Sequence, residues 1–290
     1  MTPNDTPIDE FKLYIPPIPL SESTQSQELI SGLLIQGFQS KGCHQTLDFI
    51  ALVKEVSVHI EILPQPDDVT CGPTSLHAVY RHFGYEIPLP RLISEIEFLE
   101  EGGTLAVFLG LDALKRGFEA TIYSYNLQIF DPTWVDLSMP ELREKLHQEY
   151  LVKRKVKLRT AIKAYIRFID NGGIISSKDL RVSIFENYFN NNIPVLSGVS
   201  ATYLYQCKRE YTNSEDKSIF DDLLGEPMGH FVVLYGLNNQ REFMVADPDN
   251  TNPIAKNHYY LVERNRLIHS ILLGIITYDS NMLVIQPKKP

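Results

Sequence analysis

Two apolar stretches lying close together, GHFVVLYG over residues 229–236 and REFMVAD over residues 241–247, decide the fold of this 290-residue chain. Both have the composition of β-strands, and the turn-forming pair Asn238-Asn239 between them predicts an antiparallel hairpin. If the hairpin is centred between the two asparagines, opposed residue numbers add up to 477, which places His230 opposite Asp247. Opposed residues share one face, with Cβ atoms about 5 Å apart. An imidazole N–H could then donate to a carboxylate, as in a catalytic triad.

A cysteine lies at the start of a predicted helix. The segment TCGPT over residues 70–74 precedes a helical pattern from Pro73 to about Phe83, which Gly84 ends. The N–H groups and dipole at a helix N-terminus favour a thiolate over a thiol, so Cys71 is the candidate nucleophile. Gly72 is interpreted as leaving room for a substrate to approach the sulfur. Cys43 and Cys207 are interpreted as inert thiols.

The loop before Cys71 carries further polar side chains. Gln65 lies six residues upstream, and its amide –NH₂ could join the Cys71 backbone N–H as an oxyanion hole. Asp67 and Asp68 could bind a substrate amine or cap local N–H groups. His77 and His82 lie six and eleven residues after Cys71, which points them to other sides of the helix. We therefore predict ordinary helix histidines, without a metal site or a catalytic base among them.

The remainder of the chain alternates helical and strand-like patterns around one region of different composition. Residues 127–182 hold a dense group of Lys and Arg around KRKVKLR over 153–159, and the pattern predicts an inserted helical hairpin. This basic run is typical of a solvated helix face; the alternative is a docking surface for an acidic peptide or another anionic partner. Other expected elements are an extended arm over 1–23, helices over 27–36, 105–116 and 181–189, strands over 56–63, 120–125 and 193–205, a long cover loop over 206–228, and a strand-like tail over 272–285.

Composition excludes several classes of protein. The net charge of −9 argues against a nucleic-acid binder, which needs an excess of Lys and Arg. The chain begins without a signal-peptide pattern, and its most apolar run, residues 271–277, is too short to cross a bilayer. Three cysteines, without a Cys-x-x-Cys pair, indicate reduced thiols in a cytoplasmic protein. No Gly-rich phosphate loop is present, and we expect no cofactor.

Together these motifs resemble the peptidase C39-like group of papain-like cysteine peptidases. The likeness lies in Gln65-x5-Cys71-Gly-Pro, then Gly229-His230-Phe-Val-Val, then Asp247-Pro248, in that order. The resemblance implies an α+β papain-like fold, in which a nucleophile helix packs on an antiparallel sheet, with the helical segment at about 127–182 inserted. It implies an N-terminal arm and short helix over 1–60 and a C39-like domain over 61–290.

The resemblance also implies a reaction and roles for residues. Cys71 would be the nucleophile, His230 the general base and acid, Asp247 the orienting residue and Gln65 the oxyanion donor of a hydrolase that cleaves a peptide or isopeptide bond. An acyltransferase of the phytochelatin synthase-like type and a non-catalytic peptide-binding module are the alternatives. Well-known members are fused to membrane transporters and cut leader peptides after paired glycines, whereas the tail over 274–285 looks like stand-alone bacterial members, some of which accompany ATP-grasp peptide ligases. The expected partner is therefore a peptide or protein, with an ATP-grasp ligase as a further association.

Overall fold

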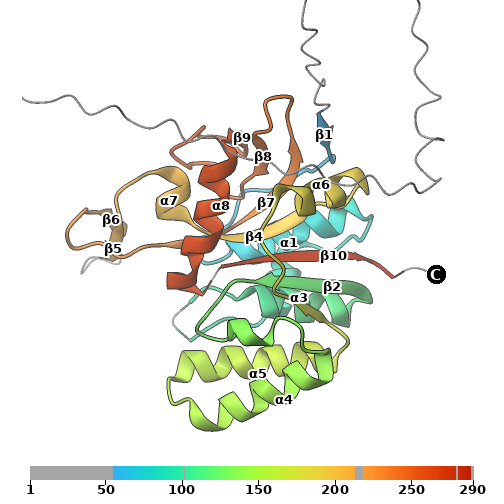
Figure 1. Ribbon diagram of the computed structural model, residues 1–290. Helices are drawn as coiled ribbons and strands as arrows, with labels where there is room; N and C mark the ends of the chain where they lie inside the picture. The colour runs from blue at the N-terminus through green and yellow to red at the C-terminus, as the bar shows by residue number, and fades with distance from the viewer. Residues whose placement is uncertain (1–54, 101, 213–217, 279, 289–290) are drawn as a thin grey trace, which may run out of the picture. The chain divides into compact units, whose positions relative to one another are not determined.

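The computed structural model describes residues 55–100, 102–212, 218–278 and 280–288 (Figure 1). The arm expected over 1–23, the helix expected over 27–36 and Cys43 lie outside the described residues. The strands are β1 (Val56–Ser57), β2 (Phe118–Ser124), β3 (Ile174–Ser176), β4 (Val195–Ser200), β5 (Glu210–Thr212), β6 (Ser218–Phe220), β7 (Gly229–Leu237), β8 (Phe243–Ala246), β9 (Tyr259–Val262) and β10 (Asn281–Pro287).

One sheet organises the described part of the chain. Its strands follow the order β3-β2-β10-β4-β7-β8-β9, and β1 pairs with β7 beside this path. Every pair in it is antiparallel except β2 with β3. The central strands β10, β4 and β7 are apolar and buried along nearly their whole length, as strands covered on both faces must be. A separate two-stranded ladder joins β5 and β6.

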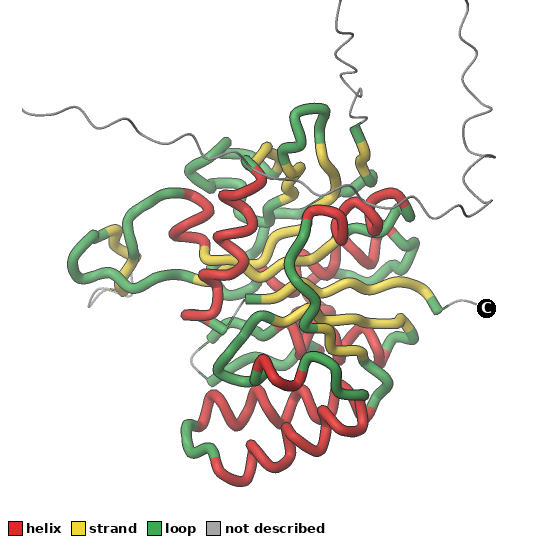
Figure 2. Tube along the Cα trace, viewed as in Figure 1, coloured by secondary structure: helices red, strands yellow, loops and turns green. Residues whose placement is uncertain are grey.

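Helices cover both faces of this sheet (Figures 1 and 2). Helices α1 and α3 pack on one face, where Gly72 of α1 meets Phe231 and Gly110 of α3 meets Ile122. Helices α6 and α8 pack on the other face, where Tyr188 of α6 contacts Tyr123. The expected α+β fold, with the helix that carries Cys71 on a largely antiparallel sheet, is confirmed. The helices are α1 (Cys71–His82), α2 (Leu89–Glu95), α3 (Ala106–Lys115), α4 (Met139–Val152), α5 (Val156–Asp170), α6 (Val182–Asn190), α7 (Ala201–Tyr205) and α8 (Arg264–Leu273), with 3₁₀ turns η1 (Pro132–Trp134) and η2 (Gly274–Thr277).

The inserted segment contains the expected helical hairpin, formed by α4 and α5. Helix α5 turns its apolar side inward and packs on α3, where Gly110 leaves room for Phe168. Three of the basic side chains make contacts within the insert or from it to the rest of the protein. Arg143 pairs with Asp170, Arg167 pairs with Glu97, and Arg159 donates to backbone carbonyls while it lies over the Tyr150 ring. Within the run over 153–159, Arg159 is therefore a contact of the hairpin itself, and the solvated helix face and the docking surface stay the two interpretations of its other basic residues.

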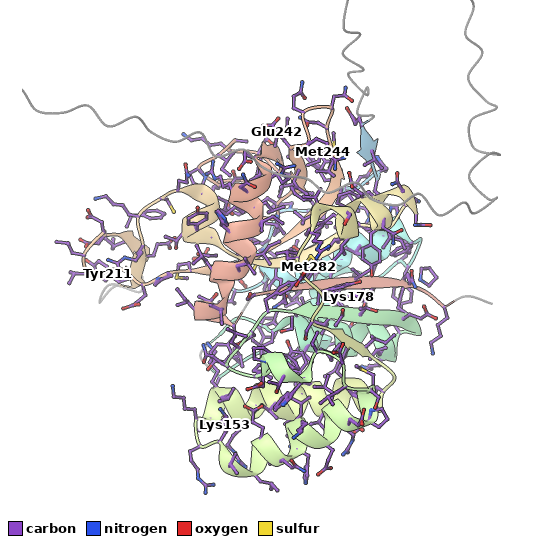
Figure 3. All side chains as sticks on the ribbon, in the orientation of Figure 1. Lys153, Lys178, Tyr211, Glu242, Met244 and Met282 are labelled. Atoms are coloured by element: carbon purple, nitrogen blue, oxygen red, sulfur yellow. The ribbon has the colours of Figure 1, made fainter. Side chains whose placement is uncertain are left out.

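The turn between these helices is the exposed part of the run. Lys153, labelled in Figure 3, lies there and pairs with Glu149, while Arg154 and Lys155 are exposed. No helix in the described part of the chain is both long and apolar enough to span a bilayer.

Four expectations about secondary structure were wrong in part. The strand expected over 193–205 ends at Ser200, whose hydroxyl accepts the Tyr203 N–H and starts α7. The loop expected over 206–228 contains the β5–β6 ladder. The tail expected as strand from 272 completes α8 and η2 before β10 begins. Residues 56–63 alternate between buried and exposed as expected, but only Val56–Ser57 form a strand, and the Val58 N–H adds one more backbone bond to the Tyr235 carbonyl of β7.

Candidate active site

Cys71 is the first residue of α1, so this helix begins two residues before the predicted start at Pro73. Its N-cap, Thr70, makes no side-chain cap bond to the helix, because the Thr70 hydroxyl donates to the Asp67 carbonyl and accepts the Asp67 N–H. Pro73 lacks an N–H in the turn where helical N–H groups have no internal partner. The first N–H groups of α1 therefore remain uncapped beside the partly buried Cys71 sulfur.

The lack of a side chain at Gly72 allows close packing inside the protein. This corrects our interpretation that Gly72 leaves room for a substrate to approach the sulfur. It is buried, and an added Cβ would lie 2.5 Å from Thr104 Cγ2 and 3.2 Å from Phe231 Cδ2. Ser75, one turn further along, donates to the Phe231 carbonyl over 3.0 Å. The absence of a side chain at Gly72 therefore lets the first turn of α1 lie directly on β7, the strand that carries His230.

The hairpin of β7 and β8 differs in register from the prediction. Leu234 pairs with Val245, and Leu237 pairs with Phe243, so the connecting loop has five residues instead of two. A bulge between Leu234 and Gly236 moves the register by one residue toward the site. Glu242 and Met244, labelled in Figure 3, lie at the loop end of this hairpin.

The net difference from the predicted register near the site is two residues, and an even shift leaves every side chain on its predicted face. His230 and Asp247 are consequently diagonal neighbours, not direct partners. Such diagonal pairs are about 7–8 Å apart at Cα, within reach of long side chains. His230 Nε2 lies 2.8 Å from Asp247 Oδ1, so the predicted contact forms.

The His230 ring links Asp247 to Cys71. An ionised carboxylate can only accept hydrogen bonds, so Nε2 carries an N–H and donates it to Asp247. Cys71 is the other group that acts on this ring, since it helps to raise the pKa of His230. Since Asp247 occupies Nε2, Nδ1 is the ring nitrogen left for a bond to the sulfur. The structure thus joins Asp247 to His230 by a hydrogen bond, and Cys71 acts on the same imidazole.

Asp247 is fully buried and accepts hydrogen bonds on both carboxylate oxygens. Oδ1 accepts from the backbone N–H of Asp249 over 2.9 Å in addition to His230. Oδ2 accepts from the hydroxyls of Tyr205 over 2.8 Å and Tyr260 over 2.5 Å. These contacts compensate for placing an ionised carboxylate out of water.

Charge coupling shifts the pKa values of the buried pair in opposite directions. Burial would lower the pKa of His230, but the charges of Asp247 and Cys71 and the hydrogen bond to Asp247 hold this pKa well above its usual value. Burial would raise the pKa of Asp247, but the charge and hydrogen bond of His230, together with the Tyr260 hydroxyl and the Asp249 N–H, lower it. The pair therefore favours imidazolium and carboxylate.

Gln65 is tied to the loop that follows Asp247. Its backbone N–H donates to the Pro248 carbonyl over 2.9 Å, and its side-chain Oε1 is buried without a hydrogen-bond partner among the described residues. Asp67 caps local backbone, since its Oδ1 accepts the Val69 N–H over 3.0 Å. Of the two roles left open for Asp67, the structure shows the capping one.

The helix histidines have the ordinary contacts that we expected. His77 Nε2 lies 2.9 Å from the Ile87 carbonyl oxygen, and burial lowers the pKa of His77. His82 contacts the carbonyl oxygens of His59 and Asn192. Across residues 55–288, leaving out the gaps named above, no three His, Cys, Asp or Glu side chains are grouped to hold a metal ion.

Tyr205 and Tyr260 are the site neighbours that sequence reasoning did not single out. Tyr205 was expected at the end of a strand but ends α7, and Tyr260 lies on β9, 55 residues further along. Neither belongs to a motif, and a tyrosine is most often a packing residue. Only the fold brings both hydroxyls to one carboxylate.

Comparisons with known proteins identify a protein family whose model matches this chain. The model of the Peptidase_C39 like family matches residues 57–266. No curated protein sequence matches the chain.

Three solved structures are similar at low identity. The peptidase domain of Streptococcus ComA, a bi-functional ABC transporter involved in a quorum-sensing pathway, is 16% identical with a TM-score of 0.38, covering 79% of this chain and 100% of its own. A provisionally named C39-like peptidase from Bacillus anthracis is 14% identical with a TM-score of 0.41, covering 82% and 100%. A double-glycine-motif protease from an AMS/PCAT transporter, solved with its leader peptide, is 13% identical with a TM-score of 0.35, covering 81% and 99%. At these TM-scores the family match, not the structural likeness, carries the assignment.

Proposed function

The chain belongs to the Peptidase_C39 like family, and from this premise we propose that it is a cysteine peptidase whose nucleophile is Cys71. The observation that supports this proposal best is the buried hydrogen bond between Asp247 and His230, with Cys71 acting on the same imidazole from an uncapped helix N-terminus. Burying a carboxylate and an imidazole together is costly unless the pair is used or compensated. The tyrosine hydroxyls and the Asp249 N–H compensate for this cost at Asp247, and the proposed use of the pair in catalysis accounts for its place beside a thiol.

In the proposed reaction the Cys71 thiolate attacks the carbonyl carbon of a peptide or isopeptide bond. The new C–S bond forms as the carbonyl π pair moves to oxygen, where the Cys71 N–H and the Gln65 amide would donate to the oxyanion. Collapse of this tetrahedral species breaks the C–N bond, and the His230 imidazolium gives its proton to the leaving amine.

Hydrolysis of the acyl-enzyme completes the cycle. Neutral His230 takes a proton from water, the hydroxide adds to the thioester carbonyl, and the Cys71 thiolate leaves as the carboxylic acid is released. Asp247 keeps Nε2 protonated throughout, which directs Nδ1 to the sulfur and the substrate. We further propose that residues 61–290 form the catalytic domain, with the helical segment at about 127–182 as an insert and residues 1–60 outside it.

A covalent probe tests this function without a known substrate. We would treat the protein with a short peptide acyloxymethyl ketone, which presents an amide-like carbonyl to a thiolate, and measure labelling by intact mass. Wild-type protein and Cys207→Ala, which changes another partly buried thiol, should both gain one label. Cys71→Ala should gain none. Undiminished labelling of Cys71→Ala would remove Cys71 from the role of nucleophile.

A further inference from the structure

The carboxylate of Asp247 has no acceptor position left for water or substrate. An ionised carboxyl group offers about four lone-pair positions. Oδ1 receives the Nε2–H of His230 and the N–H of Asp249, and Oδ2 receives the hydroxyls of Tyr205 and Tyr260. All four positions are therefore filled by donors of the protein itself.

The two hydroxyls on Oδ2 come from separate elements. Tyr205 is the last residue of α7 and Tyr260 lies within β9, so α7 and β9 are joined through Oδ2 of Asp247. The Tyr260 bond of 2.5 Å is in the range of charge-assisted O–H···O⁻ bonds, which are about twice as strong as neutral ones. Turning the carboxylate about its Cβ–Cγ bond would break both phenolic bonds at once.

Tyr205 also lies beside the imidazole. Its ring centroid is 6.0 Å from that of His230, with the planes tilted by 54°. His230 and Tyr260 are each less than a tenth exposed, and Asp247 is fully buried. The hydrogen bond between His230 and Asp247 is therefore shielded from water, and the Tyr205 ring and the two hydroxyls lie around it. A hydrogen bond shielded from water is stronger because no solvent competes for the donor or the acceptor.

We propose that Tyr205 and Tyr260 are positioning residues, which clamp Oδ2 so that Asp247 stays ionised and turned toward His230 across the working pH range. This inference rests on the proposed function, since it gives the clamp a catalytic purpose. Neither tyrosine touches the substrate in this proposal. Each acts on the reaction through Asp247 and then through His230.

The test uses Tyr205→Phe, Tyr260→Phe and the double variant, each of which keeps the ring and removes one hydroxyl or both. Tyr203→Phe is the matched control, because Tyr203 lies on the same helix and its hydroxyl contacts His269 instead. The readout is the rate of Cys71 alkylation by iodoacetamide against pH, which reports on the thiolate without needing a peptide substrate. Hydrolysis of a peptide substrate, once found, gives kcat and KM.

With the clamp removed, Asp247 takes up a proton more readily, and the acid limb of the alkylation profile should move to higher pH. The shift should be larger in the double variant than in either single variant, and absent in Tyr203→Phe. We expect kcat to fall about tenfold per hydroxyl, with KM within about twofold of wild type. A structural role alone would lower the melting temperature and leave the acid limb in place.

The outcomes separate this inference from the proposed function. An unmoved acid limb in the folded single variants, or an equal shift in Tyr203→Phe, would overturn the clamp. Failure of the wild-type protein to hydrolyse any peptide, with the shift present, would overturn the function and leave the clamp standing. If the double variant does not fold, the two single variants decide the matter.

Discussion

The backbone N–H of Gln65 donates to the carbonyl oxygen of Pro248 over 2.9 Å. This bond fixes the loop before the nucleophile helix to the residue that follows Asp247. The two ends of the proposed machinery, the oxyanion donor and the orienting carboxylate, are therefore held together by main chain. A change in the Gln65 side chain should leave this connection intact.

We expect Gln65→Ala to lower kcat of the proposed hydrolysis by about 10²–10³, the usual cost of losing one oxyanion donor. Gln65→Glu should lose as much, because it keeps the size and the backbone bond but replaces the amide donor with a carboxylate. Covalent labelling by the ketone probe, followed by steady-state kinetics, measures both variants. Full activity in Gln65→Glu would contradict an amide donor at this position.

The stability of the protein should depend on pH through His230 and Asp247. The pKa of His230 in the folded protein lies above its ordinary 6.5, so its stabilisation is complete below about pH 6.5 and is lost as pH rises through the raised pKa. The pKa of Asp247 lies below its ordinary 3.8, so its contribution is present above that pH and is lost as pH falls through the lowered pKa.

Urea unfolding of wild type and His230→Gln over a pH series measures the first effect. The difference between their free energies of unfolding should be greatest in the mildly acid range and should shrink toward alkaline pH. The control is His82→Gln, which changes a histidine that does not contact this pair. A difference that stays constant with pH would show that His230 is not held as a cation in the folded protein.

The close packing of Gly72 on its neighbours predicts a rescue. Gly72→Ala would place a Cβ 2.5 Å from Thr104 Cγ2, and we expect a loss of about 1–3 kcal/mol in the free energy of unfolding. Thr104→Ser removes that methyl group and keeps the hydroxyl bond to the Glu97 carbonyl. The double variant should recover a large part of the loss in urea unfolding, and simple additivity of the two substitutions would argue against the contact.

The loop between β7 and β8 should tolerate insertion. It spans residues 238–242, and a bulge separates its end of the hairpin from the paired residues nearer His230, so we expect the pairing beyond the bulge to keep its register when the loop is lengthened. Inserting two glycines after Asn239 should leave the rate of covalent labelling within about twofold of wild type, although loop closure becomes slightly less favourable. A large loss of labelling would show that the loop sets the register after all.

Local sequence patterns predicted much of the fold, because the residues that decide these elements lie close together in the sequence. Gly84, at φ +73°, ends α1 as expected, and the apolar runs of β7 and β8 form the hairpin. The strand expected over 193–205 was wrong in its second half, since the hydroxyl of Ser200 caps a helix where β-branched and aromatic residues suggested a strand. Tertiary context decided between the two.

The candidate site was likewise predictable in part from local sequence patterns and in part only from the folded chain. The contact of His230 with Asp247 followed from alternation along two adjacent strands, and it survived an error in register because that error was even. The hydroxyls of Tyr205 and Tyr260 could not be predicted in this way. Each reaches Asp247 from an element with no fixed spacing to it in sequence, so only the folded chain shows the contact.

The bulge in β7 has a consequence for how this part of the molecule can vary. The bulge adds one unpaired residue to β7 between the turn and the site, so the register of strand pairing differs by one residue between the two ends of the hairpin. We expect an odd change in the number of residues at the turn end to be absorbed by gaining or losing such an unpaired residue. If the insertion experiment bears this out, the turn is the place to attach a reporter or a second domain without disturbing His230 and Asp247.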